Sequence, residues 1–324
     1  MNSTQQTSSH FQLGLLFATT AVVFWGVLPI ALKLSSAFID PVSLTWFRFF
    51  TAFVISVVIQ YLGGRLLQFK QLERLDWIKL TLAALCSVSN YVTFVYCLEY
   101  LAPGPAQLNF QTAPFFLAFG GALFFKERLS ALQMSCFATL ALGMLMFFNP
   151  YLSASDQPWQ RVLIGVALVQ FSALSWVCYA LLQKSLIAKL SPANILLYIY
   201  GAGLFMMLPF VEFTHFAVMS GEQWVIALFC AFNTLIAYGS FAQSMKYWPT
   251  AQVGATVALT PIFSFLSSAV IVELGWWQGI IESPPITTLA YLGIALVILS
   301  VLCVQLQPLW NRRNKAKKSG ALDG

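Results

Sequence analysis

Charge is what this 324-residue sequence has least of: only 9% of its residues are charged, against 59% that are hydrophobic. A soluble globular protein carries about 25% charged residues, so this chain has too few to cover the surface of a water-soluble fold of its size. The sequence also lacks the strict alternation of apolar and polar residues that a membrane β-barrel needs over strands of about 10 residues. Instead its apolar runs continue for about 20 residues. The composition therefore predicts an all-helical integral membrane protein.

Catalytic and metal-binding patterns are missing as well. The only two histidines are His10, in the N-terminal tail, and His215, near a loop, and we expect neither to hold a metal. The six cysteines lie in apolar runs and form no CxxC pair, which indicates small core residues rather than disulfides or metal ligands. No HExxH, GxSxG or GxxxxGK[ST] motif occurs. The sequence therefore predicts no catalytic residue, cofactor or metal, and excludes ATP-driven transport by this chain alone.

Carboxylates are absent from the middle of every apolar run. All eleven acidic residues lie in loops, in tails or in the last turn of a predicted helix. Proton-relay acids of pumps are usually found near the membrane midplane, so direct proton coupling through a central acid is disfavoured, while facilitated export or exchange stays open. Glu99, at the outer end of the third apolar run, is the nearest candidate for a proton-linked group. The alternative for Glu99 is a capping or pairing role at a helical hairpin.

Ten apolar segments are present, each long enough to cross a hydrocarbon core about 30 Å thick. Polar or Pro/Gly-rich breaks separate them. The predicted spans are 13–33, 41–62, 77–99, 104–125, 130–149, 162–184, 192–212, 223–245, 250–273 and 287–306.

The basic residues predict the orientation of these spans. If both ends are cytoplasmic, 14 of the 17 Lys and Arg residues lie in inside loops or in the C-terminal tail. Only Lys33 and Arg161 lie outside, and Arg48 lies within a span. Basic residues are enriched on the cytoplasmic side of membrane proteins. The net charge of +6 is therefore a topology signal with affinity for anionic headgroups. The expected partners are the lipid bilayer and a small-molecule solute, with no nucleic acid and no nucleotide.

The two halves of the chain resemble each other. Shifting the sequence by 147 residues, or by 151 near the start of each half, superposes aromatic residues and prolines at matching helix positions. The matches include Trp25 with Trp176, Trp77 with Trp224, Tyr91 with Tyr238 and Pro114 with Pro261. This periodicity predicts two repeats of five spans each, over 13–150 and 161–306. A cytoplasmic tail, 1–12, precedes the first repeat, and a basic cytoplasmic tail, 307–324, follows the second.

Because five is an odd number, the second repeat would cross the membrane upside down. Inverted repeats of this kind are typical of secondary transporters, in which the substrate site lies between the repeats near the midplane. The repeat therefore predicts a transporter from the sequence pattern alone.

Four short motifs also resemble a known family. They are Trp25-Gly26 followed by Lys33, then Phe47-Arg48-Phe49, then Leu98-Glu99-Tyr100-Leu101 running on to Pro114, and lastly Lys126-Glu127-Arg128-Leu129-Ser130. In this order and spacing the chain resembles the EamA-type permeases of the drug/metabolite transporter superfamily. The resemblance implies ten helices in two repeats, and export or exchange of small metabolites, often amino acids or related compounds, across the bacterial inner membrane. The second half has no arginine equivalent to Arg48, so we expect an asymmetric site.

Arg48 is the only charge clearly inside a predicted span. A charge at such a depth costs about 2.5–3.5 kcal/mol on insertion scales. One interpretation is that its forked donors anchor a substrate carboxylate. The other is that it snorkels outward, or bonds helix-end carbonyls and Glu99.

Neutral polar and aromatic residues within the spans complete the set of candidate cavity residues. Unpaired amides are costly in lipid, so they should face the bundle interior, where they line a cavity or form interhelical hydrogen bonds. With Arg48, the candidates are Trp25, Asn90, Tyr91, Tyr96, Asn109, Gln111, Trp176, Tyr179, Asn233, Tyr238 and Gln243.

Pro114 and Pro261 occupy equivalent places inside predicted spans four and nine. A proline inside a helix removes a hydrogen bond and kinks the helix. The two kinks could act as paired gates or could simply set the static shape.

These observations lead to one functional hypothesis and one alternative. We expect an inner-membrane secondary carrier that moves small neutral or zwitterionic metabolites by alternating access through a central cavity. The alternative is a membrane-embedded enzyme, or a flippase for lipids or lipid-linked sugars, on the same helical scaffold.

Overall fold

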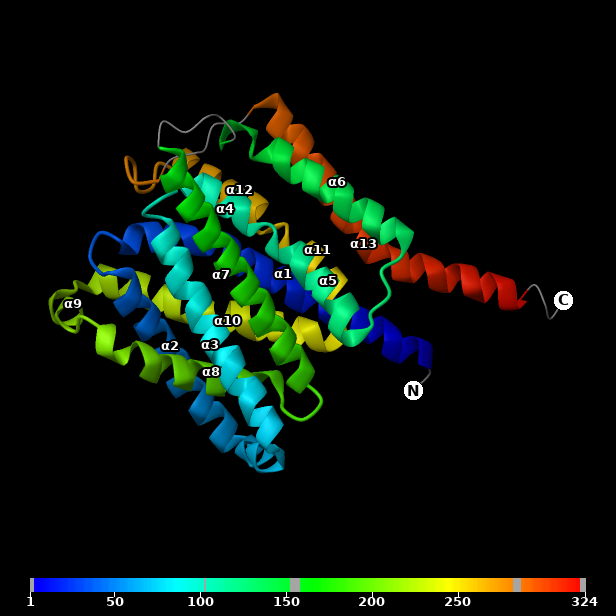
Figure 1. Ribbon diagram of the computed structural model, residues 1–324, viewed down its shortest axis with the longest axis horizontal. Coiled ribbons are helices and arrows are strands. Elements are labelled where there is room, and N and C mark those ends of the chain that lie inside the picture. The colour runs from blue at the N-terminus through cyan, green and yellow to red at the C-terminus, as the bar shows by residue number, and fades with distance from the viewer. Residues whose placement is uncertain (1–2, 102, 152–157, 282–286, 321–324) are drawn as a thin grey trace.

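The computed structural model describes residues 3–101, 103–151, 158–281 and 287–320 (Figure 1). All of the regular structure in these ranges is helical. Nine of the helical segments are long and apolar enough to cross a membrane, and Ala131–Phe147 is a shorter apolar helix. The prediction of an all-helical membrane protein is therefore confirmed.

The helices of the first half are α1 (Ser3–Ser35), α2 (Pro41–Leu62), η1 (Arg65–Gln71), α3 (Arg74–Cys97), α4 (Pro103–Phe110), α5 (Ala113–Phe125), α6 (Ala131–Phe147) and η2 (Asn149–Tyr151). Those of the second half are α7 (Trp159–Leu186), α8 (Pro192–Met207), η3 (Leu208–Phe210), α9 (Thr214–Val218), α10 (Gly221–Tyr247), α11 (Thr250–Val257), α12 (Thr260–Glu273) and α13 (Thr288–Gly320).

Local signals in the sequence account for many of the helix ends. Ser130 and Ser220 each form a capping box with the Gln three residues later, at the start of α6 and α10. Asp40 caps α2 by accepting hydrogen bonds from the backbone N–H groups of residues 42 and 43. These three helix starts are therefore fixed by side chains close in sequence, and each lies within two residues of the predicted start of its span.

Two predicted spans are each broken into two helices. The segment 104–125 divides into α4 and α5, and 250–273 divides into α11 and α12. Pro114 and Pro261 lie in the first turn of α5 and α12, where a missing N–H costs no helical hydrogen bond. Each proline therefore begins the second half of a discontinuous helix instead of kinking a continuous one.

The helix pairing shows a two-fold pattern. Under the sequence repeat α1 corresponds to α7 and α3 to α10, so the packed pairs α1–α10 and α3–α7 are equivalent. The pairs α2–α10 and α3–α8 are likewise equivalent, and α2–α8 and α6–α13 each pair a helix with its own counterpart. All six pairs join the first half to the second, so the two repeats form one intertwined bundle (Figure 1).

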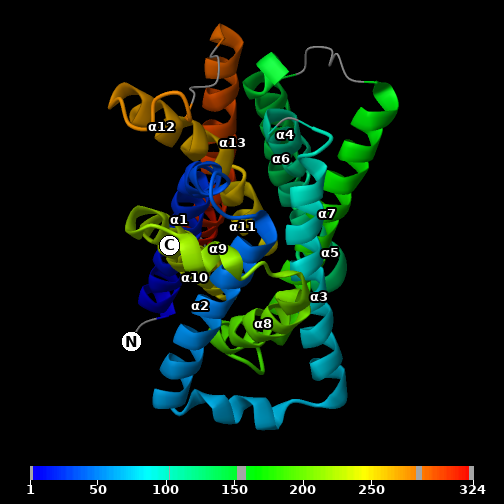
Figure 2. The same cartoon turned by 90° about the vertical axis from the view of Figure 1, so that its left-hand side faces the viewer.

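One pair departs from this symmetry. The helices α5 and α11 pack together, but among the described residues their symmetry equivalents, α12 and α4, form no comparable interface. Figure 2 shows α12 and α4 on separate sides of the upper part of the molecule, whereas η1 crosses the lower end. With the predicted topology, α5 and α11 lie on the cytoplasmic side and α4 and α12 on the outer side. The halves are thus packed together more closely on the predicted inner side.

The outer surface of the bundle is apolar. Large hydrophobic side chains on several helices are mostly exposed, including Leu123 at 75%, Phe205 at 69% and Leu16 at 60%. Apolar surface on this scale requires a nonaqueous environment. The buried core, in contrast, contains residues from both halves, such as Ala18, Leu117, Trp176 and Phe241. Polar side chains are buried in the same interior, among them Arg48, Asn90 and Thr234.

Candidate functional site

Arg48 lies in the interior of the bundle and is only 2% exposed. Its Nε donates a 2.7 Å hydrogen bond to Oγ1 of Thr234 on α10. The guanidinium carbon is 5.4 Å from the centroid of the Tyr91 ring on α3. Among the described residues Arg48 has no acidic partner, and its Nη2 is buried without a hydrogen-bond partner. The structure therefore favours neither snorkelling nor pairing with Glu99.

Four tyrosines from four helices lie at or near this cation. The Tyr91 ring contacts Arg48 directly, and the Tyr238 ring lies 6.0 Å from that of Tyr91 and 6.2 Å from that of Tyr179. Tyr200, on α8, lies close enough to Arg48 for their charges to interact. The hydroxyl groups of Tyr179 and Tyr200 are buried without hydrogen-bond partners. A buried unpaired polar group costs about 1–3 kcal/mol. We call Arg48, Thr234 and these four tyrosines the Arg48 cluster; it holds more hydrogen-bonding capacity than the described residues use.

Repeat-related aromatic residues meet within this cluster and beside it. The ring centroids of Trp25 and Trp176 are 6.1 Å apart, and those of Tyr91 and Tyr238 are 6.0 Å apart. The Trp25 ring also lies 5.2 Å from that of Tyr238. Residues related by a two-fold axis can touch each other only close to that axis, so these two pairs mark the interface between the repeats. The Arg48 cluster therefore lies where an inverted-repeat transporter would bind its substrate.

Two amide candidates join helices to one another. Asn90 donates to Oγ of Ser172 at 2.8 Å and to its backbone carbonyl at 3.1 Å, and the Ser172 hydroxyl donates back to the Asn90 carbonyl. Asn233 donates a 2.6 Å bond to the backbone carbonyl of Phe24. These contacts connect α3 to α7 and α10 to α1, which gives both amides an interhelical role.

The remaining candidates lie apart from the cluster or have local partners. Asn109 donates to the Pro105 carbonyl, and its own carbonyl accepts from Gln170. Gln111 is buried at the break between α4 and α5, and Gln243 is half-buried on α10. Tyr96 is 51% exposed near the end of α3 and does not join the cluster. Glu99 is exposed, and its backbone carbonyl accepts a hydrogen bond from Arg161.

Sequence reasoning missed two members of the cluster. Thr234 lies four residues before Tyr238, so the two side chains share one face of a helix, and this spacing could have identified it. Tyr200 sits in an apolar run with no polar neighbour at helical spacing on its own face that would single it out. Only the packing of α8 against α2 and α3 brings it close to Arg48.

Two groups of ionic contacts connect the halves at the end predicted to be cytoplasmic. Glu127 pairs with Lys184 on α7 and accepts hydrogen bonds from the N–H and hydroxyl of Thr250 at the start of α11. Lys189 donates a 2.7 Å hydrogen bond to Asp76 at the start of α3, and this contact raises the pKa of Lys189. These contacts hold together the side on which α5 and α11 are packed.

Comparison with known proteins identifies the family. The sequence profile described as "EamA-like transporter family" matches residues 12–149 and, a second time, residues 163–306. The chain belongs to the EamA-like transporter family. It is a multi-pass membrane protein, and the family accounts for its two repeats.

Curated relatives in this family carry transporter names. One, "Uncharacterized inner membrane transporter YhbE" of Escherichia coli strain K12, is 30% identical over 292 residues, covering 88% of this chain and 89% of the relative. An "Uncharacterized transporter" of Haemophilus influenzae is 28% identical over 289 residues, covering 88% and 92%. A solved crystal structure has the same fold, with a TM-score of 0.70 at 16% identity over 91% of this chain and 97% of the other. The EamA resemblance in the sequence is therefore confirmed.

Proposed function

We propose that this EamA-family transporter moves small metabolites that carry a carboxylate, namely amino acids and related zwitterions, with Arg48 as the carboxylate anchor. One observation carries the proposal: Arg48 is a buried cation with no acidic partner among the described residues and with an unused donor at Nη2. An unpaired charge inside a membrane protein is costly and marks a functional site. A solute carboxylate supplies the missing charge.

The chemistry of the cluster supports this class of solute. Arginine offers two parallel donors in a fork that matches the two oxygens of a carboxylate. The free hydroxyls of Tyr179 and Tyr200 can bond further oxygens of the solute. The rings of Trp25, Trp176 and Tyr238 provide faces that attract an ammonium group. A zwitterion uses all three kinds of group and adds no net charge to the interior.

Transport would follow alternating access between the halves. Two observations support a conformation closed on the cytoplasmic side. The helices α5 and α11 pack together whereas α4 and α12 form no comparable interface among the described residues, and the ion pairs Glu127–Lys184 and Asp76–Lys189 connect the halves on that same side. In the opposite conformation α4 and α12 would pack and these ionic contacts would break. We infer that both termini are cytoplasmic, and that the protein acts as a carrier in the inner membrane and not as an enzyme.

Flux measurements in proteoliposomes test this function. Purified protein is reconstituted, and uptake of labelled amino acids is followed with and without a pH gradient and with and without unlabelled amino acid inside. We expect saturable uptake of carboxylate-bearing solutes that the internal amino acid accelerates. The absence of a described carboxylate from the Arg48 cluster predicts that a pH gradient has little effect.

Two results would overturn the proposal. Scrambling of labelled lipid without flux of any solute in a broad panel would favour a flippase. Covalent conversion of a solute during uptake would favour a membrane enzyme.

A further inference from the structure

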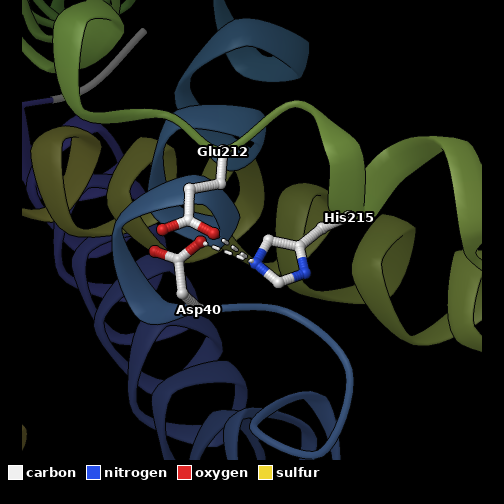
Figure 3. Close-up of side chains that lie close together, drawn as sticks. All are labelled: Asp40, Glu212 and His215. Atoms are coloured by element: carbon white, nitrogen blue, oxygen red, sulfur yellow. Dashed lines mark ion pairs between the residues drawn. The ribbon is translucent and has the colours of Figure 1, made fainter.

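A second group of ionisable side chains lies at the outer end of α2, away from the Arg48 cluster. Asp40 precedes α2, while Glu212 and His215 lie around the start of α9, so the group joins the two halves of the chain (Figure 3). The ligand atoms of the three side chains all lie within 4.8 Å of one another. The sequence predicted no metal site for His215, and the structure places two carboxylates beside its ring.

The geometry of this group matches a small metal ion. Nε2 of His215 lies 3.2 Å from Oε2 of Glu212 and 3.5 Å from Oδ2 of Asp40. Zinc binds nitrogen and carboxylate oxygen at about 2.0–2.2 Å, so two of its ligands in a tetrahedral site lie roughly 3.3–3.6 Å apart. The two separations from His215 are close to this range, so small shifts of these side chains would admit a metal ion between them.

The position of the Asp40 carboxylate is set by the surrounding backbone. Oδ1 of Asp40 accepts hydrogen bonds of 2.9 Å from the N–H groups of Val42 and Ser43. This capping directs Oδ2 toward the ring of His215, and Oδ2 is buried without a hydrogen-bond partner. The backbone N–H of Glu212 donates a 2.9 Å bond to Oγ of Ser43, which fixes the second segment against α2. The Asp40 ligand atom is thus preorganised, and the backbone of Glu212 is held beside it.

The charges of the group also suit a metal cation. Among the described residues, neither Asp40 nor Glu212 pairs with a lysine or an arginine; their ion-pair contacts are with His215 alone. Two carboxylates this close repel each other unless a positive charge lies between them. A divalent ion bound between the three side chains supplies that charge and takes Nε2 of His215 as a nitrogen ligand.

We propose that Asp40, Glu212 and His215 form a binding site for a divalent transition metal of the zinc class, with a fourth position open to water. The three ligands, one imidazole nitrogen and two carboxylates, suit such an ion and do not suit the all-oxygen preference of calcium or magnesium. Bound metal connects the start of α2 to the segment between α8 and α10. The site is about 12 Å along α2 from Arg48, by the helical rise over eight residues.

Zinc binding by the purified, tag-free protein in detergent tests the site. Isothermal titration with zinc chloride should show one site per chain, and zinc should raise the thermal unfolding temperature. The variants His215→Ala and Glu212→Gln should each bind zinc at least about tenfold more weakly. Asp40→Asn, which keeps the cap on α2, should do the same. The matched control is His10→Ala, which removes the only other histidine and should leave zinc affinity unchanged.

A spectroscopic measurement separates ligation from a change in folding. Cobalt(II) bound at this site should give the absorption of a four-coordinate ion, and His215→Ala should remove it while Arg48→Ala keeps it. Zinc affinity that is the same in the wild type and His215→Ala, or the absence of stoichiometric binding by the wild type, would overturn the proposal. The test uses no transport assay, so its outcome is independent of the proposed function.

Discussion

Single residues decide what this bundle can bind, and the Arg48 cluster illustrates how. Arg48 donates a hydrogen bond from Nε to Thr234, while its Nη2 has no hydrogen-bond partner. Asn90, in contrast, uses its amide to bond Ser172 on the neighbouring helix α7. A free donor indicates a ligand, whereas a satisfied amide indicates packing, because unpaired buried polar groups are costly. The sequence places Arg48 and Asn90 in one set of cavity candidates, and their hydrogen bonding in the structure distinguishes the ligand-binding candidate from the packing residue.

Tyr200 provides a test at this scale. Its hydroxyl has no partner within the described protein, so Tyr200→Phe should leave the thermal unfolding temperature unchanged or slightly raised. If the hydroxyl bonds the solute, the concentration for half-maximal uptake should rise roughly tenfold, or about 1.4 kcal/mol. The measurement is saturable uptake in proteoliposomes alongside thermal unfolding in detergent.

Tyr198→Phe is the matched control for this substitution. Its hydroxyl shares a 2.9 Å hydrogen bond with Thr81 at an exposed position, so we expect normal uptake. A Tyr200→Phe variant with normal uptake would remove this hydroxyl from the solute site.

At the scale of helices, the two discontinuous segments are where we propose that the halves move against each other. The helix α11 approaches α5 so closely that a Cβ added at Gly254 would lie 2.7 Å from the backbone carbonyl oxygen of Pro114. Only glycine allows this approach, since no Cβ is found at such a distance from backbone. The contact lies on the closely packed side that we propose to be cytoplasmic.

Gly254→Ala should therefore push α5 and α11 apart. We expect a loss of about 1–3 kcal/mol in the free energy of unfolding and slower uptake. Gly239→Ala on α10 is the control, because a Cβ there meets nothing within 4 Å, and it should change neither quantity. Equal behaviour of the two variants would contradict the tight α5–α11 contact.

The ionic contacts on the same side give a second test. Glu127→Gln weakens both the pair with Lys184 and the capping of α11 through Thr250. We expect the cytoplasmic side to open more often, so that a cysteine placed at Ala251, which is buried in α11 and already carries a Cβ, reacts faster with a membrane-permeant maleimide. Glu222→Gln, at the exposed start of α10, is the charge-matched control. Unchanged reactivity in Glu127→Gln would show that this contact does not keep the side closed.

For the whole molecule, the sequence predicts the architecture better than the site. The spans follow from apolar runs and capping residues close in sequence, such as Ser130 with Gln133, so they were predicted almost completely. The breaks in spans four and nine were not, because a proline in the first turn of a helix and one inside a helix look alike in sequence. Tyr200 beside Arg48, and His215 beside Asp40, depend on packing between residues more than 150 positions apart. No local pattern encodes such contacts.

The orientation of the whole chain is a further prediction. In a background without native cysteines, Gln160→Cys on α7 should react with an impermeant maleimide added to intact cells. Lys70→Cys in η1 should react only after the membrane is opened, because the distribution of lysine and arginine places it inside. Both positions are exposed. The reverse labelling pattern would contradict a cytoplasmic location of both termini.

The role of Arg48 as carboxylate anchor is tested most directly by comparing an amino acid with its methyl ester or amide as competitors of labelled amino-acid uptake. In wild-type proteoliposomes the free acid should compete better than the ester by roughly 30- to 100-fold, about 2–3 kcal/mol for a buried charge pair. In Arg48→Ala this preference should disappear, while Lys33→Ala, which removes an exposed cation, should retain it. An Arg48→Ala variant that folds, transports and still prefers the free acid as strongly as the wild type would contradict the account.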